Sequence, residues 1–255
     1  MSLSGKVAVV TGAARGIGSG ILRALAKQGA NVAFSYVSPS SEPIAIALVK
    51  ELEALGVRAT CVRVDMAAAT APSELIEATL KGLQTEKIDI LVNNAGLGGN
   101  APLEDITSEE YERIMAVNVK SVIFMTQAIL PYLNRGGRIV NLSSISARGG
   151  YSTQTVYAAS KAAVEGFTRV WATELGHKYG VTVNSVNPGP VDTDMYRAAG
   201  PVHLARMEAE NKKVPAAPRC GTEADVADIV VFLCEERARW ITGDTICANG
   251  GMLYT

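Results

Sequence analysis

Tyr157 and Lys161 are the two side chains of this sequence best placed to act together in acid-base chemistry. They lie four residues apart in the segment YAASK, and on a helix this spacing puts both side chains on the same face. A phenol titrates at about pH 10, and a cation about 5 Å away in an effective dielectric of ~20 stabilises its ionised form by roughly 3 kcal/mol. The sequence therefore predicts that Lys161 lowers the pKa of Tyr157 by about two units, so that Tyr157 can give and take a proton.

Hydroxyl groups just upstream of Tyr157 offer a way to hold a carbonyl oxygen. Ser143, Ser144 and Ser146 follow an apolar run that ends at Leu142. Open parallel sheets bind ligands beyond the carboxyl ends of their strands, so these hydroxyls are expected to face a binding cleft. Hydroxyls in this position also often make only local turn bonds, and these residues alone leave both interpretations open.

A glycine-rich turn follows the first apolar run of the chain. Gly12, Gly16 and Gly18 lie in TGAARGIG, a GxxxGxG spacing. Glycines there allow a tight turn and let a pyrophosphate approach the start of the next helix, where free N–H groups and the helix dipole favour anions. Glycines also serve plain turns and packing, but their place between a strand and a helix favours a dinucleotide site.

The segment after the second apolar run indicates which dinucleotide is bound. This run ends at Tyr36, and Ser38, Ser40 and Ser41 follow without an acidic residue among them. Dinucleotide folds select NAD with an acid here, whereas hydroxyls and the nearby Arg15 can bind a 2'-phosphate. The sequence therefore predicts NADP (NADPH) as the cofactor. Alternatively, the serines only cap the next helix and Arg15 is solvated, which would leave the choice open.

Short apolar runs alternate with segments of helical spacing along the whole chain. The predicted strands are residues 7–10, 32–36, 59–64, 88–92, 138–142, 181–186 and 245–248, and the predicted helices are 17–28, 43–55, 73–83, 108–133, 156–179 and 223–235. Parallel strands need crossover connections, which place helices on both faces of the sheet. We predict an α/β Rossmann fold, a doubly wound seven-stranded parallel sheet, formed by residues 1–255 as a single domain.

One segment, residues 192–218, has mixed polarity, several prolines and no strand pattern. Long insertions in compact domains are often binding loops, so we interpret it as a substrate lid; the alternative is a surface excursion without function. Met195 and Tyr196 on this lid and Tyr151 opposite are the expected substrate contacts, together with Ser144. Their apolar and aromatic character suits a ring-bearing ketone.

Composition and charge limit the classes of partner. The 255 residues are 48% hydrophobic and 19% charged, with a formal net charge of -1. Such a balance provides no broad field for nucleic acid or for an anionic membrane, so the expected partner is a small molecule. The first apolar run is too short for a signal peptide or a membrane span, and we expect a cytoplasmic protein.

The cysteines and histidines are not spaced as metal ligands, and we predict no metal site. These residues are Cys61, Cys220, Cys234, Cys247, His177 and His203. Because Cys61, Cys234 and Cys247 lie in apolar runs, we expect them to be buried free thiols. His203 is expected to be solvated, without a catalytic role.

Five motifs together carry a family resemblance. They are TGAARGIG, NNAG at residues 93–96, a serine 13 residues before Tyr157, YAASK, and PGPVDT at residues 188–193. With these motifs in this order, the chain resembles the short-chain dehydrogenase/reductase family over nearly its whole length. Within the family it looks closest to the fungal polyhydroxynaphthalene and versicolorin-type reductases, and is similar at one remove to the 3-oxoacyl-carrier-protein reductases.

The resemblance implies a catalytic tetrad. Ser144 would polarise a carbonyl, Tyr157 would protonate it, and Asn118 would help a water-linked proton path. Lys161 would act beside Tyr157 and also hold the ribose hydroxyls of the cofactor. Ser143 competes with Ser144 for the same role, and the family's spacing to the tyrosine favours Ser144.

The resemblance also implies how the cofactor is held. Asp65 would contact the adenine, Asn93 and Gly96 would flank the nicotinamide ribose, and Val191 and Thr193 would contact the carboxamide. The full predicted cofactor set is Gly12, Arg15, Gly16, Ile17, Gly18, Tyr36, Ser38, Ser40, Ser41, Asp65, Met66, Asn93, Ala95, Gly96, Tyr157, Lys161, Pro188, Gly189, Val191 and Thr193.

These expectations define an NADPH-dependent reductase that converts a ketone to a secondary alcohol, with a ring-bearing or polyketide-type substrate typical of secondary metabolism. The alternative is an NADPH-binding regulator or a redox-neutral cyclase, because a fold alone does not determine function. The complete tetrad favours the reductase. The resemblance further implies a homotetramer or dimer in which long helices such as residues 156–179 pack together.

Overall fold

The chain folds around a seven-stranded sheet with the strand order β3-β2-β1-β4-β5-β6-β7, in which all neighbouring strands are parallel. The computed structural model describes residues 1–254, apart from the side chains of Val202 and His203, so the expectation for His203 lies outside the described residues. The strands are β1 (Val7–Val10), β2 (Asn31–Tyr36), β3 (Ala59–Arg63), β4 (Ile88–Asn93), β5 (Leu133–Leu142), β6 (Thr182–Pro188) and β7 (Thr245–Ala248). The predicted doubly wound Rossmann fold is confirmed.

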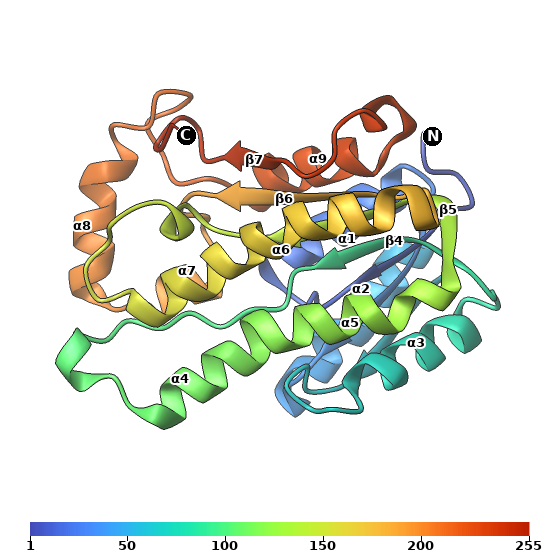
Figure 1. Ribbon diagram of the computed structural model, residues 1–255, viewed down its shortest axis with the longest axis horizontal. Helices are drawn as coiled ribbons and strands as arrows, with labels where there is room; N and C mark the ends of the chain where they lie inside the picture. The colour runs from blue at the N-terminus through green and yellow to red at the C-terminus, as the bar shows by residue number, and fades with distance from the viewer. Residues whose placement is uncertain (255) are drawn as a thin grey trace.

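Helices cover both faces of this sheet (Figure 1). On one face lie α1 (Gly16–Lys27), α2 (Glu42–Glu53) and α9 (Glu223–Cys234), and on the other lie α3 (Ala71–Gly82), α5 (Ser121–Ile129) and α6 (Thr155–Tyr179). Alternate residues of a strand point to opposite faces. In β1, Ala8 and Val10 therefore belong to the first apolar cluster, and Val7 and Val9 to the second. This double burial explains why the strands are apolar throughout.

The order of the strands places a crevice at their carboxyl ends. The chain moves outward from β1 through β2 to β3, then returns to the other side of β1 to form β4. Open α/β sheets bind ligands where the order reverses in this way. In Figure 1 the strand arrows end at the edge where α7 (Asp194–Arg197) and α8 (Pro201–Asn211) lie.

Three elements differ from the sequence prediction. The predicted helix 108–133 consists of α4 (Ser108–Met115), a π-helical turn (Ala116–Lys120) and α5. The strand predicted from residue 138 begins earlier, with irregular pairing to β4. The lid contains helices α7 and α8, which were not predicted; Pro201 stands at the start of α8, where proline is compatible with a helix.

One helical stretch of the described chain, Ser108–Tyr132, has the length and hydropathy of a membrane-spanning helix, with a mean hydropathy of 1.5 over its most apolar window. In the structure 44% of that window is buried within the protein. Met125 and Ile129 belong to the core beneath the sheet, so packing accounts for much of this apolar character. The cytoplasmic location stays a prediction.

None of the four cysteines forms a disulfide, but their predicted burial is only partly correct. Cys234 is buried, Cys61 is half-buried and Cys247 is exposed. Cys247 lies on β7, which is an edge strand of the sheet. The residues of β7 are less buried than those of the central strands. The prediction that Cys247 is buried was therefore wrong.

Candidate active site

A cavity of about 790 Å³ opens at the carboxyl edge of the sheet, between the glycine-rich turn, the loop after β5, the start of α6 and the lid. Most of the predicted site residues meet there, although they come from segments far apart in the sequence. The predicted residues that line it are Gly12, Arg15, Gly16, Ile17, Gly18, Gly96, Ser144, Tyr151, Tyr157, Lys161, Pro188, Gly189, Val191, Thr193, Met195 and Tyr196.

The remaining predicted residues do not line this cavity. They are Tyr36, Ser38, Ser40, Ser41, Asp65, Met66, Asn93, Ala95 and Asn118. Tyr36 and Met66 are buried in the core, and Asp65 is exposed with its carboxylate accepting from the backbone of Ala67. Contacts between these residues and a cofactor stay predictions.

The two asparagines of NNAG have different surroundings. The Asn93 amide is buried and donates to Thr126 Oγ1 at 3.0 Å and to Asn141 Oδ1 at 2.8 Å. The next residue, Asn94, lines the cavity and donates to the carbonyl oxygens of Thr11 and Gly12. Sequence reasoning missed Asn94, because a doublet of asparagines does not show which side chain leaves the sheet toward the ligand.

Two glycines of the glycine-rich turn, Gly12 and Gly18, have no room for a side chain. Gly12 has φ 62°, and a Cβ added there would lie 2.9 Å from Ala95 Cα. A Cβ added to Gly18 would lie 2.6 Å from Asn94 Nδ2. The turn leads directly into α1, whose first turn contains no acidic residue. The start of this helix is therefore suited to an anionic pyrophosphate.

Arg15 connects the turn to two other segments. Its guanidinium donates to Ser41 Oγ at 2.7 Å and pairs with Asp194 Oδ2 at 3.3 Å. Ser38 accepts from the backbone N–H of Ser40, and their hydroxyl oxygens are 2.6 Å apart. The capping role left open for these serines thus applies to Ser38. Ser41 instead accepts from Arg15, and Arg15 lines the cavity.

Ser144, Tyr157 and Lys161 lie at the inner part of the cavity. Burial lowers the pKa of Lys161 to about 8, and its amine donates to the carbonyl oxygen of Leu142 at 2.8 Å. The Lys161 Nζ atom is 5.9 Å from the centre of the Tyr157 ring. Burial raises the pKa of Tyr157, and a hydrogen bond with Ser144 opposes that rise.

These contacts correct the prediction for the pKa of Tyr157. The sequence predicted that Lys161 lowers the pKa of Tyr157, but in the structure burial dominates and raises that pKa. The Lys161 amine donates its hydrogen bond to the Leu142 carbonyl oxygen. Tyr157 is thus held as a neutral phenol, the form that can donate a proton.

Asn118 lies behind the cavity in the π-helical turn. Its amide donates to the Leu97 carbonyl oxygen at 2.9 Å and to Ser160 Oγ at 3.0 Å, and it accepts from the Leu97 N–H at 2.8 Å. A Cβ added to Gly96 would lie 3.5 Å from Asn118 Oδ1 and 3.4 Å from Lys161 Nζ. Asn118 and Lys161 therefore both lie next to Gly96.

The outer part of the cavity is formed by the lid and by Tyr151. Met195 and Tyr196 line it as predicted, and the Tyr196 hydroxyl accepts from Asn211 Nδ2 at 3.1 Å at the far end of α8. Sequence reasoning missed several further lining residues because it did not predict the lid helices or the path of the loops. They include Leu97, Ile145, Gln154, Ala198, Ala199 and Arg206.

A parallel doubly wound sheet, a glycine-rich turn at a helix start and a serine, tyrosine and lysine beside it define a dinucleotide-dependent oxidoreductase. The sequence profile of the family described as enoyl-(acyl carrier protein) reductase matches residues 12–253. Short-chain dehydrogenase/reductase FrzI of Cladobotryum sp is 48% identical, over 99% of this chain and 97% of that protein. The chain belongs to the short-chain dehydrogenase/reductase family, which confirms the resemblance.

Other similar proteins bear reductase names. A hydroxynaphthalene reductase-like protein of Metarhizium robertsii is 39% identical, over 98% of this chain and 96% of that protein. A blue fluorescent protein from a metagenomic library, solved in complex with NADPH, is 42% identical with a TM-score of 0.91, over 100% of both chains. The angucycline C-6 ketoreductase LanV, solved with bound NADP, is 36% identical with a TM-score of 0.91, over 99% of this chain and 97% of that chain.

Proposed function

We propose that this protein is an NADPH-dependent ketoreductase that converts a ring-bearing or polyketide-type ketone to a secondary alcohol. The observation that carries the proposal is that Ser144, Tyr157 and buried Lys161 meet at one cavity, which the glycine-rich turn also lines. Two similar structures contain NADPH or NADP, and two similar proteins are named as a ketoreductase or a hydroxynaphthalene reductase-like protein.

The residues at the cavity fit an NADP cofactor. Gly12, Gly16 and Gly18 leave the start of α1 open to a pyrophosphate, and Arg15, which donates to Ser41 behind it, offers a cation for a 2'-phosphate. The remaining predicted contacts are proposed on the family's pattern. When bound, NADPH supplies the hydride for the reduction.

The chain's own groups act on the carbonyl oxygen of the substrate. The Ser144 and Tyr157 hydroxyls donate hydrogen bonds to that oxygen, and Tyr157 then delivers its proton to it. The charge of Lys161 stabilises the tyrosinate that this transfer leaves. Asn118, held against Leu97 and Ser160, supports the surroundings of Lys161 and is proposed to help resupply the proton through water.

The lid and the cavity's apolar lining support the substrate class. Met195 and Met207 provide flexible apolar contacts, and Tyr151 and Tyr196 provide rings with a polar end. Such a surface suits a flat, ring-bearing molecule with peripheral oxygens. We propose that residues 192–218 close over it and that residues 1–255 act as a single domain.

A second copy of the chain is the proposed macromolecular partner, in a homotetramer or dimer. Ile123 and Phe124 on α5 and Val170 on α6 are exposed apolar side chains on the long helices. Sedimentation at working concentration is expected to show an assembly larger than one chain. A single monomeric species would contradict this part of the proposal.

The test measures the oxidation of NADPH or NADH in the presence of a panel of quinone, naphthol-type and 3-oxoacyl ketones. The loss of absorbance of the reduced nicotinamide reports the rate. We expect NADPH oxidation with at least one ring-bearing ketone and a loss of about 10³-fold in Tyr157→Phe, which removes the proton donor. Tyr132→Phe, at the opposite edge of the sheet, is the matched control. Binding of NADPH without oxidation on any ketone would instead support a regulator or a redox-neutral cyclase.

A further inference from the structure

Glu165 is a buried carboxylate that the tetrad does not include. It lies on α6, four residues beyond Lys161 and eight beyond Tyr157, and is 5% exposed. It does not line the cavity. Burying a carboxylate costs free energy unless the carboxylate is hydrogen-bonded. The donors that bind Glu165 therefore show which parts of the structure it holds together.

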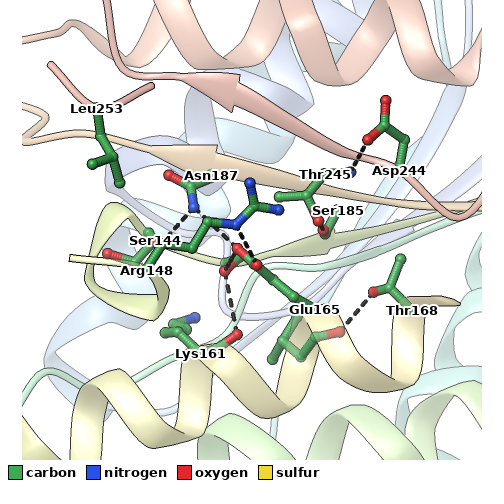
Figure 2. A network of polar contacts seen from close by, with 12 residues as sticks. Ser144, Arg148, Lys161, Glu165, Thr168, Ser185, Asn187, Asp244, Thr245 and Leu253 are labelled. Carbon is green, nitrogen blue, oxygen red and sulfur yellow. Dashed lines mark hydrogen bonds and ion pairs between the residues drawn. The ribbon is translucent and has the colours of Figure 1, made fainter. Parts of the chain in front are cut away.

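Three donors converge on this carboxylate. Ser143 Oγ donates to Oε1 at 2.9 Å, Asn187 Nδ2 donates to the same oxygen at 3.0 Å, and Arg148 Nε donates to Oε2 at 2.7 Å. Figure 2 shows Arg148 and Asn187 pointing toward Glu165 from different parts of the chain. Two of the donors lie in the loop after β5, and the third lies in β6.

These donors surround the backbone of Ser144. Ser143 precedes it, Arg148 ends the short helical turn that Ser144 caps, and Asn187 Nδ2 also donates to the Ser144 carbonyl oxygen at 2.8 Å (Figure 2). The Asn187 amide thus connects the Glu165 carboxylate directly to Ser144, which lines the cavity together with Tyr157.

We propose that Glu165 is a positioning residue for the reaction: it fixes the Ser144 loop to the helix that carries Tyr157 and Lys161. This inference rests on the ketoreductase function proposed above. Tyr157 and Glu165 lie on one helix, so the distance between the two reacting hydroxyls depends on how firmly the loop is attached to that helix. A small displacement of an aligned donor lowers the rate of the chemical step more than it lowers ligand affinity.

Glu165→Gln tests this role with little change in volume. The amide replaces one acceptor oxygen by a donor, so Arg148 or the Ser143 and Asn187 pair loses its acceptor. We expect kcat to fall about tenfold, with NADPH affinity within about twofold of the wild type, because the cofactor turn is outside this network. Glu174→Gln, an exposed glutamate of the same helix, is the matched control and should leave both quantities unchanged.

A double-mutant cycle separates positioning from general destabilisation. If Glu165 acts through Ser144, Ser144→Ala will lower kcat much less in the Glu165→Gln background than in the wild type. Independent, additive losses would overturn the proposal. If Glu165→Gln folds poorly, Ser143→Ala, which removes one donor to the carboxylate, takes its place in the same cycle.

Crystal structures of the wild type and Glu165→Gln provide a readout that needs no turnover. We expect the Ser144 hydroxyl to move away from the Tyr157 hydroxyl while the glycine-rich turn stays in place. An unmoved Ser144 would overturn the positioning role. A wild type that reduces no ketone would overturn the proposed function, and the geometric test of Glu165 would still be decided by these structures.

Discussion

The cavity has two sides that are built differently. The catalytic wall consists of the loop after β5, the first half of α6 and the end of β6, and its polar groups Ser143, Lys161 and Glu165 are buried with hydrogen-bond partners. The lid, residues 192–218, carries its ion pairs on the surface. In the pairs Arg197 with Asp192 and Lys212 with Glu208, every side chain is more than half exposed.

This difference has energetic consequences. An exposed ion pair contributes about 0–1 kcal/mol, so the lid pairs do little to fix its position. Removing one member of a buried hydrogen-bond network costs far more free energy, because the remaining groups stay desolvated without partners. The proposed reacting groups therefore lie where the geometry is held firmly, and the proposed substrate contacts lie where the geometry can change at small cost.

Ser144→Ala removes one hydroxyl of the catalytic wall and is expected to have the largest effect after Tyr157→Phe. Loss of one donor to a developing oxyanion lowers kcat by about 100-fold, whereas the KM for NADPH should stay within about twofold. Steady-state kinetics with the best ketone of the panel measures both. Ser152→Ala, an exposed serine outside the cavity lining, is the control. A similar loss in kcat and in NADPH affinity would show that Ser144 also contributes to cofactor binding.

Arg15 connects the lid to a third part of the cavity, because it belongs to the glycine-rich turn and pairs with Asp194 of the lid. Arg15→Ala should raise the KM for NADPH about 20-fold, as expected for loss of a charged contact to a phosphate, and leave the KM for NADH unchanged. Arg58→Ala, at the opposite edge of the sheet, is the control. Equal losses with both cofactors would assign Arg15 to the lid rather than to the 2'-phosphate.

The buried lysine is expected to give the reaction a pH dependence. Burial lowers the pKa of Lys161 to about 8, so its charge is present below that pH and is lost above it. Burial raises the pKa of Tyr157, so the phenol stays protonated over the same range. We expect kcat/KM for reduction to be level below about pH 8 and to fall about tenfold per pH unit above it. A profile that stays level well into alkaline pH would show that the Lys161 charge is not needed.

The sequence predicts the fold and the centre of the site well because both depend on local patterns. Apolar runs interrupted by helical segments determine a parallel sheet. The spacing of Tyr157 and Lys161 puts both residues on one helix face, and the structure brings both to the cavity.

Features that depend on tertiary packing were not predictable in this way. Glu165 has the same helical spacing as an ordinary surface charge, and only its packing against β6 shows that it is buried. The π-helical turn at Asn118 interrupts a helix without interrupting its apolar pattern. In the lid, prolines indicated a loop, although Pro201 is compatible with the helix that it begins.

Met195→Ala tests the lid with the smallest expected effect. Met195 is exposed at 52% yet lines the cavity, so its truncation removes a modest apolar contact to the substrate. A loss of about 1 kcal/mol corresponds to a roughly fivefold rise in the KM for the ketone, with kcat nearly unchanged, because the contact is the same before and during the reaction. Steady-state kinetics across several ketones should show the rise varying with ring size. A fall in kcat as large as that of Ser144→Ala would mean that the lid also positions the reacting groups, and the two sides would then not be separable in function.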